Sequence, residues 1–415
     1  MSTHIQHASS EITQEQTEEQ KRTPEKWRRV LETTPNPFPE YHRMRESNPV
    51  YYNEETTFWE VFRYHDVLHV ISDYETFSSE RVVGSDQAAI ERLRKEGWRE
   101  EDLPTKSILS TDPPRHRQLR ALVTQAFTPR TVALLTPRIT EIVNDLLEKV
   151  ATTGRMDVIQ DLSYPLPVIV IAEMLGVPID DRAQFKRWSD SILDPSEDVP
   201  MQAIKEMNSY FRQIIAQRRA DPREDLISGL VAAQIDGEKL SERELLSFCV
   251  LLLIAGNVTT TNLIGNAILC FDEYPEAMDQ LREDLSLLSG AIEEVLRYRS
   301  PVQRLVRVAT IDTVIGGKEI KAGQLVVPCL GSANRDEAQF PDPDVFDIRR
   351  TPNRHVAFGH SIHFCIGAPL ARLETKIALA AMLERFTNIQ RIQEIPLESV
   401  AGLYGVKSLP ITFQG

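Results

Sequence analysis

A helix that is apolar on nearly every side places the strongest constraint on how this chain can fold. Helical periodicity covers residues 242–270, and within it residues 251–254 leave no polar face. Such a helix must be surrounded by the rest of a protein core. The residues that follow are Ala255, Gly256, Asn257, Val258, Thr259, Thr260 and Thr261. Glycine and threonine there weaken a helix by roughly 0.5–1 kcal/mol per residue, so the irregularity is either tolerated or serves a function.

One thiol lies in a glycine-punctuated turn that leads into a helix. Cys365 stands between Gly359 and Gly367, and apolar residues recur at helical spacing after this turn. A helix N-terminus favours a thiolate over a thiol, and glycine lets the backbone approach a flat ligand. Cys365 is therefore a candidate metal ligand. The alternative is a buried, inert cysteine, because free cysteine usually behaves as a small hydrophobic residue.

Composition and charge restrict the classes of partner. The chain has 415 residues, a net charge of −14 and a pI near 5.3. Because phosphate binding needs a concentrated basic surface, we expect no nucleic-acid partner. The first 22 residues contain no apolar run, and no uninterrupted apolar run of about 18 residues follows, so we expect no signal peptide and no membrane segment. The four cysteines are widely spaced and form no C-x-x-C motif, which fits a reducing cytoplasm rather than a zinc site or disulfides.

The remaining patterns predict a mainly α fold with a minor β part. Residues 1–22 are expected to form a disordered polar tail, and residues 23–415 a single domain. A β-hairpin is predicted from residues 50–52 and 58–62. Further helices are predicted at 139–150, 201–218, 276–298 and 370–386, and short strands at 305–309, 325–329 and 409–413. The charged segment 81–109 is predicted to be a long loop with a short helix, either disordered or functional.

The sequence around Cys365 resembles the cysteine-ligand loop of the cytochrome P450 family, which reads F-x-x-G-x-H/R-x-C-x-G. Phe358, His363, Cys365 and Gly367 match this motif, whereas Ser361 stands at the family's mid-loop glycine. The resemblance implies the family's fold, in which haem b (iron protoporphyrin IX) lies between a long central helix and the helix after the cysteine loop. It implies that Cys365 binds the iron. The other haem contacts that it implies are Phe358, Gly359, Gly367, Ala255 and Gly256.

A second motif looks like the family's D-P-P-x-H-x-x-x-R helix. Residues 112–120 open a helix that puts His116 and Arg120 on one face, which by itself is typical of a solvated basic surface. The resemblance implies instead that His116 and Arg120, together with Arg307 and His355, bind the haem propionates. Two histidines and two arginines can partner the two carboxylates of the haem. A buried carboxylate without such partners would destabilise the folded protein.

A third motif resembles the family's E-x-x-R. Glu294 and Arg297 are three residues apart in a strongly helical stretch, so their charged groups can meet. Most such pairs lie on the surface and contribute little. The resemblance implies a buried pair that engages a later segment, and we assign Glu294 and Arg297 to folding rather than to catalysis.

The segment after the apolar helix looks like the family's oxygen-activation motif, A-G-x-D/E-T-T. Thr259 stands at the conventional threonine, but Val258 stands at the acidic position and cannot relay a proton. We therefore expect protons to reach the site through Asn257, Thr260 or solvent, or else a different chemistry.

The resemblance implies a monooxygenase that inserts one oxygen atom from O2 into an apolar organic substrate. Hydroxylation or epoxidation of a fatty acid, terpenoid, steroid or macrolide would fit, with electrons from ferredoxin and ferredoxin reductase, in a cytoplasmic monomer. One alternative is an enzyme like the NADH-dependent nitric oxide reductases, in which an acid-free A-G-N-x-T segment also occurs. A haem-binding sensor or carrier is another.

The resemblance also places the substrate and the electron donor. The substrate pocket would be lined from 81–109, 184–212 and several apolar positions. These positions are Leu252, Ala255, Val258, Val302, Leu305, Leu403 and Val406. Candidate basic contacts for an acidic ferredoxin are Arg115, Arg117, Arg372 and Lys376, although exposed cations are more often merely solvated.

Overall fold

The computed structural model describes residues 36–80 and 91–415, apart from short gaps. The gaps are 92, 96, 101–102, 104–105, 179–180, 182–183, 186, 189–190, 192–197, 236, 394–397 and 401. The predicted tail at residues 1–22 lies outside the described residues. Residues 81–90, the first part of the predicted loop, also lie outside them.

The apolar helix predicted at 242–270 forms the centre of the fold. It is α12, Glu242–Glu273, and it begins with a capping box in which Ser241 and Glu244 satisfy each other's backbone N–H groups. α12 contacts α8 (Pro165–Met174), α10 (Asp198–Ala220) and α16 (Ala368–Arg385). By length and hydropathy α12 could cross a membrane, but 61% of its most apolar window is buried inside the protein. This burial is what a core helix shows.

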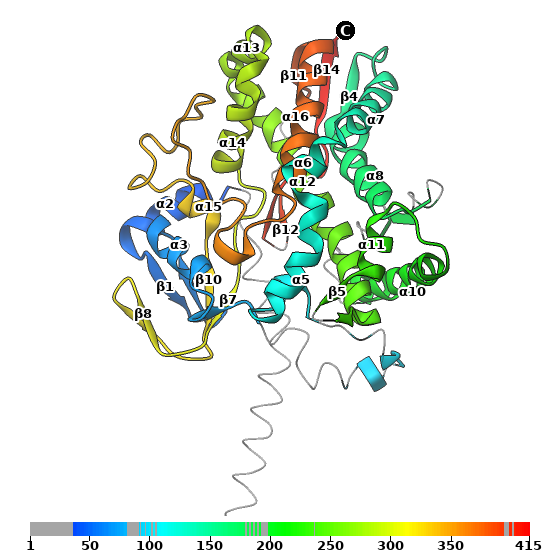
Figure 1. Cartoon of the computed structure of the whole chain (residues 1–415). Helices are drawn as coiled ribbons and strands as arrows, with labels where there is room; N and C mark the ends of the chain where they lie inside the picture. The colour runs from blue at the N-terminus through cyan, green and yellow to red at the C-terminus, as the bar shows by residue number, and fades with distance from the viewer. Residues whose placement is uncertain are drawn as a thin grey trace, which may run out of the picture.

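The other helices surround α12, as Figure 1 shows. On one side lie α7 (Thr136–Glu148), α8, α10 and α11 (Leu226–Ala232). The stretch predicted as one helix at 276–298 is divided into α13 (Pro275–Glu283) and α14 (Leu288–Tyr298). The division falls at Asp284, whose side chain accepts a hydrogen bond from the Ser286 N–H and starts a separate 3-10 turn, Leu285–Leu287. Further α-helices whose bounds the structure describes are α2 (Phe38–Ser47), α3 (Tyr64–Ser72), α5 (Arg115–Thr124), α6 (Pro129–Ala133) and α15 (Leu330–Ala333). The other short helical turns are Ile108–Ser110, Gln125–Phe127, Val158–Ser163 (a π-helix) and Ser361–His363.

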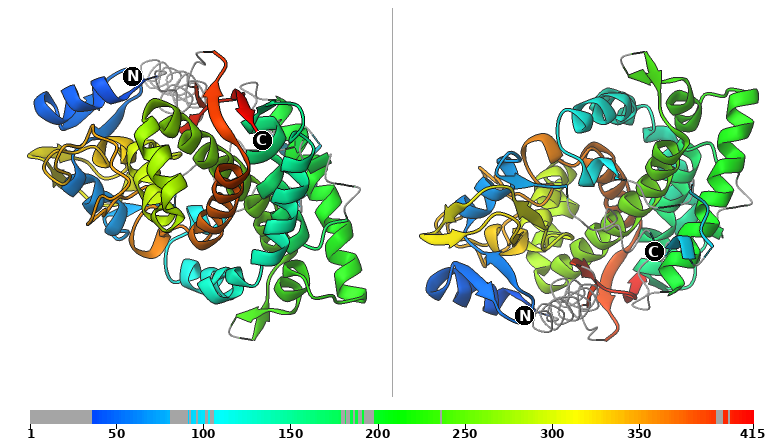
Figure 2. Two further views of the ribbon diagram at one scale, coloured as in Figure 1. Left: turned by 90° about the horizontal axis from the view of Figure 1, so that it is seen from above. Right: turned by 90° about the horizontal axis from the view of Figure 1, so that it is seen from below.

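The main β-sheet lies opposite α7 and α10, and the two views in Figure 2 agree on this separation. The strand order of this sheet is β1-β2-β10-β7-β3. These strands are β1 (Val50–Asn53), β2 (Phe58–Val61), β10 (Leu325–Pro328), β7 (Arg307–Ala309) and β3 (Phe77–Ser78). The predicted hairpin is therefore confirmed as β1–β2, and β2 continues the sheet by pairing in parallel with β10.

Four smaller sheets complete the structure. A three-stranded sheet joins β11 (Thr387–Arg391), β14 (Pro410–Gln414) and β4 (Arg155–Asp157). The three two-stranded sheets are β12 (Glu398–Val400) with β13 (Leu403–Gly405), β5 (Gln234–Ile235) with β6 (Glu238–Lys239), and β8 (Thr313–Ile315) with β9 (Lys318–Ile320). The fold is thus mainly helical with a minor β part, as predicted.

The pair Glu294 and Arg297 joins α14 to the long connection after α15. Both side chains are 0% exposed, and the guanidinium binds the carboxylate through two hydrogen bonds of 2.8 and 2.7 Å. Arg297 also donates to the carbonyl oxygens of Asn334, Pro343 and Val345. Glu294 also accepts from Arg350 and Asn353. Every charged atom is thus partnered, which is what a buried ion pair requires.

Candidate active site

The cysteine loop is held by its own backbone. The N–H of Cys365 donates to the carbonyl oxygen of Phe358 at 2.8 Å, which closes the loop just before α16 begins. Two loop residues have positive φ angles, Gly359 at +72° and Ser361 at +58°. Glycine adopts this conformation freely, whereas a residue with a Cβ is strained in it. The position at which Ser361 replaces the family's glycine is therefore one whose backbone favours glycine.

Cys365 differs from the other three cysteines in its surroundings. Cys249, Cys270 and Cys329 are buried, and burial raises the pKa of each thiol to about 12. Cys365 is exposed. Desolvation still raises the pKa of its thiol, because the sulfur is recessed, but backbone N–H groups of Gly367 and Ala368 and the cations Arg120 and Arg372 oppose that shift. Cys365 is thus the accessible thiol, and its neighbours stabilise a negative sulfur.

Beside the cysteine loop, two histidines lie against each other. The ring centroids of His116 and His363 are 4.4 Å apart. His116 is 1% exposed and neither of its ring nitrogens has a hydrogen-bond partner, and Nε2 of His363 also lacks one. That atom lies 3.5 Å from Oδ1 of Asp112, a distance at which a protonated His363 forms an ion pair with the carboxylate. Buried polar nitrogens without partners are rare and indicate a group that binds there.

The charge around this pair suits an anion. Burial, together with the charges of the neighbouring His363 and Arg120, lowers the pKa of His116 to about 4. Arg120 approaches the same place and donates to the carbonyl oxygen of Phe364 at 2.7 Å. The carboxylates of a haem fit a pocket of this kind, since they would accept from these nitrogens and compensate the cations. His363 was not among our predicted propionate ligands, although the histidine of the F-x-x-G-x-H/R-x-C motif marks it in the sequence.

The other two predicted propionate ligands, Arg307 and His355, have hydrogen-bond partners within the protein. Arg307 is buried on β7 and donates to the carbonyl oxygen of Val306. In His355, one ring nitrogen contacts Glu293 at 3.1 Å and the other accepts from the N–H of Ala357 at 3.2 Å. Both ring nitrogens of His355 are therefore engaged, in contrast to those of His116.

The middle of α12 has one accessible face. Ala255 is exposed and Thr259 is half-buried, and the Thr259 hydroxyl donates to the Ala255 carbonyl oxygen at 2.9 Å. Asn257 is 0% exposed, and its side-chain oxygen accepts from Thr261, which also donates to the carbonyl oxygen of Ser163. Two residues along a helix turn the side chain by about 200°, so Asn257 lies on the side away from Thr259. Thr260 is buried as well.

Two predicted substrate-pocket segments come together although they are about a hundred residues apart. Val302 and Leu403 form an antiparallel bridge, and Leu305 is half-buried nearby in sequence. Val406 is buried, and its Cγ2 atom lies 4.0 Å from the Cβ position of Gly265 in α12. On α12 itself, Leu252 is buried and Val258 is half-buried.

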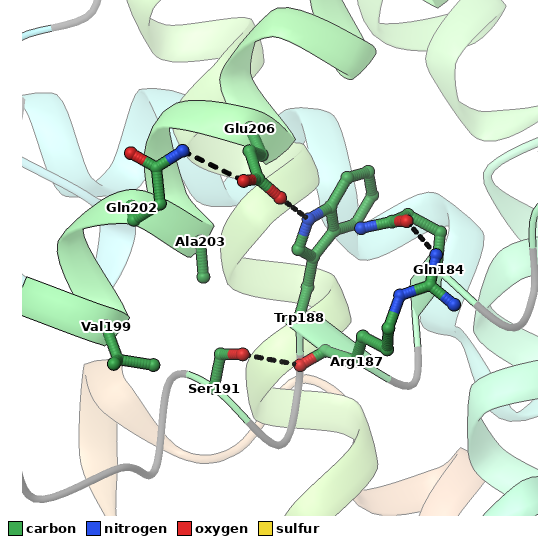
Figure 3. A pocket seen from close by; sticks show the side chains of 8 residues that line it. All are labelled: Gln184, Arg187, Trp188, Ser191, Val199, Gln202, Ala203 and Glu206. Carbon is green, nitrogen blue, oxygen red and sulfur yellow. Dashed lines mark hydrogen bonds between the residues drawn. The ribbon is translucent and has the colours of Figure 1, made fainter.

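A surface cavity of about 350 Å³ lies between residues 184–191 and the first turns of α10 (Figure 3). Its wall includes Trp188, whose indole N–H donates to Glu206 at 2.9 Å, while Gln202 donates to the other oxygen of the same carboxylate. Arg187 is hydrogen-bonded to Gln184. The cavity falls in the 184–212 region predicted to line the substrate pocket. Its polar side chains, however, bind one another, as the dashed lines in Figure 3 show.

Within the part of the chain that the structure describes, no three His, Cys, Asp or Glu side chains gather to hold a metal ion. A single accessible thiolate fits a metal whose other ligands come from a macrocycle, as in haem.

Comparisons with known proteins identify the relatives of this chain. A family model described as cytochrome P450 matches residues 36–193 and 183–400. Cytochrome P450 109 of Bacillus spizizenii is 43% identical over 392 residues, covering 90% of this chain and 91% of that protein. Cyclomarin C epoxidase CymV of Salinispora arenicola is 41% identical over 384 residues, covering 89% and 94%.

Solved structures give the same result for the fold. The crystal structure of CYP109E1 from Bacillus megaterium in complex with testosterone has a TM-score of 0.81 and 43% identity, and the match covers 91% of this chain and 99% of that chain. CYP109Q5 from Chondromyces apiculatus gives a TM-score of 0.84 at 43% identity, with 93% and 96% covered. The predicted fold is therefore confirmed. This chain belongs to the cytochrome P450 family and is a haem-thiolate monooxygenase, an oxidoreductase.

Proposed function

We propose that the protein uses haem b to insert one oxygen atom from O2 into a large, mostly apolar organic substrate, by hydroxylation or epoxidation. The observation that carries this proposal is Cys365, an accessible thiol with backbone N–H groups directed at it. It stands next to buried histidine nitrogens that have no partner. When bound, a haem with a thiolate ligand supplies the cleavage of the O–O bond.

Hydrogen-bond donors and cations of this chain hold the propionates. We assign His116, Arg120 and His363 to this role on their mutual proximity, and Arg307 on the family motif alone. His355, which we predicted as a fourth ligand, is better assigned to the cysteine loop, because both of its ring nitrogens are already engaged there.

Thr259 is the residue of α12 best placed to hold a proton donor near the substrate. Its hydroxyl donates to the Ala255 carbonyl oxygen, so its oxygen remains free to accept from a water molecule. Asn257 and Thr260 are buried, which argues against the route that we predicted through them. Protons therefore reach Thr259 through solvent, since Val258 carries no proton.

The apolar positions support an apolar substrate. Val302, Leu305 and Leu403 come from two paired segments, and Leu252 and Val258 come from α12. Among similar proteins, CYP109E1 has been crystallised with testosterone and with corticosterone. A four-ring, mostly apolar molecule is thus the substrate class that we propose.

The electron donor is a separate ferredoxin, which its own reductase reduces. The protein itself is a monomer in the cytoplasm. Of the four basic candidates, Arg115 is paired with Glu244 and Arg372 with Glu293. Arg117 and Lys376 are the exposed ones. We therefore assign the attraction of an acidic ferredoxin mainly to Arg117 and Lys376. The four free cysteines fit a reducing compartment.

The test is spectroscopic. The purified protein should bind haem and show the red-shifted band of a thiolate-ligated, reduced carbon monoxide complex, and Cys365→Ser should lose that band. Addition of testosterone should shift the haem spectrum and, with ferredoxin and reductase, give an oxygenated product. If the parent protein instead reduces nitric oxide with NADH alone and oxygenates nothing, the alternative enzyme class is correct.

A further inference from the structure

A second charged network lies beside the cysteine loop, and it begins one residue before Glu294. The carboxylate of Glu293 on α14 accepts two hydrogen bonds from the guanidinium of Arg372 on α16, at 2.6 and 2.7 Å. It also contacts Nε2 of His355 at 3.1 Å. Burial alone would raise the pKa of Glu293, but the hydrogen bonds from Arg372 and His355 outweigh burial and lower it to about 2. The carboxylate is thus firmly ionised.

The tautomer of His355 follows from its two contacts. The N–H of Ala357 donates to Nδ1, so Nδ1 must offer a lone pair. The ring proton is therefore on Nε2, where it can be donated to Glu293. A neutral histidine satisfies both partners at once, and it ties Glu293 to the backbone at the start of the cysteine loop.

Arg372 reaches the same loop from the other side. Its guanidinium carbon lies 4.6 Å from the ring centroid of Phe358, within the range of a cation–π contact. The carbonyl oxygen of Phe358 in turn accepts the N–H of Cys365. A closed path of contacts therefore runs from Cys365 through Phe358 to Arg372, then to Glu293, His355 and Ala357, and back to Phe358.

We propose that Glu293, Arg372 and His355 form a brace that positions Phe358 and, through it, the thiolate of Cys365. The three are positioning residues, since none of them is placed against the iron ligand itself. Three separate elements meet in the brace, so a single substitution releases both the ring and the backbone of Phe358. The proposal rests on the proposed role of Cys365 as haem ligand.

The chain offers a matched control for the loss of charge. Lys376 lies one turn after Arg372 on α16 and is exposed. Both line a surface groove of about 380 Å³ formed by α6, α14 and α16. Lys376→Met therefore removes a cation from the same groove without touching Phe358 or Glu293.

The experiment compares Arg372→Met, Arg372→Lys, Glu293→Gln and Lys376→Met in the haem-loaded protein. Two quantities are measured: the reduction potential of the haem, and the fraction of the reduced carbon monoxide complex that keeps the thiolate-type band. If Arg372 and Glu293 acted only through their electric fields, removing the cation and removing the anion would shift the reduction potential of the haem in opposite directions. The brace predicts shifts in the same direction for Arg372→Met and Glu293→Gln, because both release Phe358.

The brace also predicts that Arg372→Lys does not restore the properties of the parent protein. An ammonium group cannot bind the Glu293 carboxylate through two parallel hydrogen bonds, and it has no planar surface to stack on Phe358. We expect up to about a tenfold change in the equilibrium constant for haem reduction, which is about 59 mV for one electron. The thiolate-type fraction should fall in the Arg372 and Glu293 variants and stay at the parent value in Lys376→Met.

The outcomes separate this inference from the proposed function. If the parent protein itself lacks the thiolate-type band, the assignment of Cys365 fails and the brace with it. If the parent shows the band, the brace is overturned by opposite shifts, by full rescue in Arg372→Lys, or by variants that only unfold at a lower temperature. Glu293→Gln preserves shape and keeps the test valid if an arginine variant fails to fold.

Discussion

The imidazoles of His116 and His363 lie 4.4 Å apart, and three of their four ring nitrogens have no hydrogen-bond partner. One ring comes from α5 and the other from the cysteine loop, so the pair joins two segments that the chain order separates widely. A buried pair of this kind is costly unless an anion lies between the rings and Arg120.

We therefore expect His116→Ala and His363→Ala each to weaken haem retention. A hydrogen bond to a charged group contributes about 1.5–3 kcal/mol, so haem should bind roughly 10- to 100-fold more weakly. Transfer of haem to apomyoglobin measures this. His360→Ala is the control, because His360 is in the same loop but is exposed and contacts Ser72. Equal retention in all three variants would contradict the assignment.

Ser361→Gly should stabilise the protein. Ser361 holds φ at +58°, which costs a residue with a Cβ roughly 1–2 kcal/mol, while glycine gives back about 0.5–1 kcal/mol through unfolded-state entropy. The net gain in the free energy of unfolding should be up to about 1 kcal/mol, measured by urea denaturation. Ser361→Ala keeps the Cβ and should show no gain. A loss of stability in Ser361→Gly would show that the hydroxyl matters more than the backbone.

The buried pair Glu294 and Arg297 should be far more important for stability than an exposed pair of the same spacing. Removal of one partner from a buried ion pair costs about 3–5 kcal/mol, so Arg297→Met should sharply lower the midpoint of thermal unfolding. Arg43 and Glu40 are also three residues apart on a helix but are well exposed. Arg43→Met should therefore leave the midpoint of thermal unfolding nearly unchanged, because solvent screens an exposed pair. Similar effects of the two substitutions would refute a structural role for Glu294 and Arg297.

Glu374 should make stability depend on pH. It is 2% exposed on α16, and burial raises the pKa of its carboxyl from 4.5 to about 8. The folded protein therefore holds a proton that the unfolded chain releases, so the free energy of unfolding falls as pH rises from about 4.5 to about 8. The size of this loss is roughly 3–5 kcal/mol. Glu374→Gln, which is neutral at every pH, should remove this part of the pH dependence, and an unchanged stability profile would disprove the prediction.

On α12, Thr259→Ala should divert reducing equivalents from product to peroxide. Asn257→Ala should leave the yield of product per reducing equivalent unchanged. Thr259 lies on the accessible face with Ala255, but the side-chain oxygen of the buried Asn257 accepts a hydrogen bond from Thr261. Product formed per reducing equivalent consumed, with peroxide as the by-product, measures the difference. Val258→Glu should improve this ratio by less than the 10²–10⁴-fold that a positioned acid typically gives, because burial would raise the pKa of the new carboxyl group. Loss of coupling in Asn257→Ala would restore the route that we first predicted.

Local patterns in the sequence were sufficient for the main elements. The apolar run before Gly256 predicted the central helix, and the alternation around Trp59 predicted the first hairpin, because burial imposes these periods directly. The helix predicted across Asp284 was wrong as one element, since a side-chain cap interrupts a continuous apolar pattern.

The arrangement of the site depended on contacts between distant segments. The motif around Cys365 identified the loop and includes His363, but the contact between His363 and His116 joins segments that lie far apart in the sequence. Glu293 likewise is adjacent to a recognisable motif yet binds residues 62 and 79 positions later. Such pairs follow from the packing of α14 against α16, which periodicity alone does not define.

The parallel pairing of β2 with β10 also determines the order in which this protein can be completed during synthesis. Trp59 on β2 donates to Gln324, just before β10, and these residues are 265 positions apart. At a translation rate of about 5–20 residues per second, the hairpin β1–β2 waits roughly 15–50 s for its neighbour. During that time one edge of β2 offers unpaired backbone groups to any other strand. A nascent chain of this protein therefore depends on protection of its N-terminal hairpin until β10 has left the ribosome.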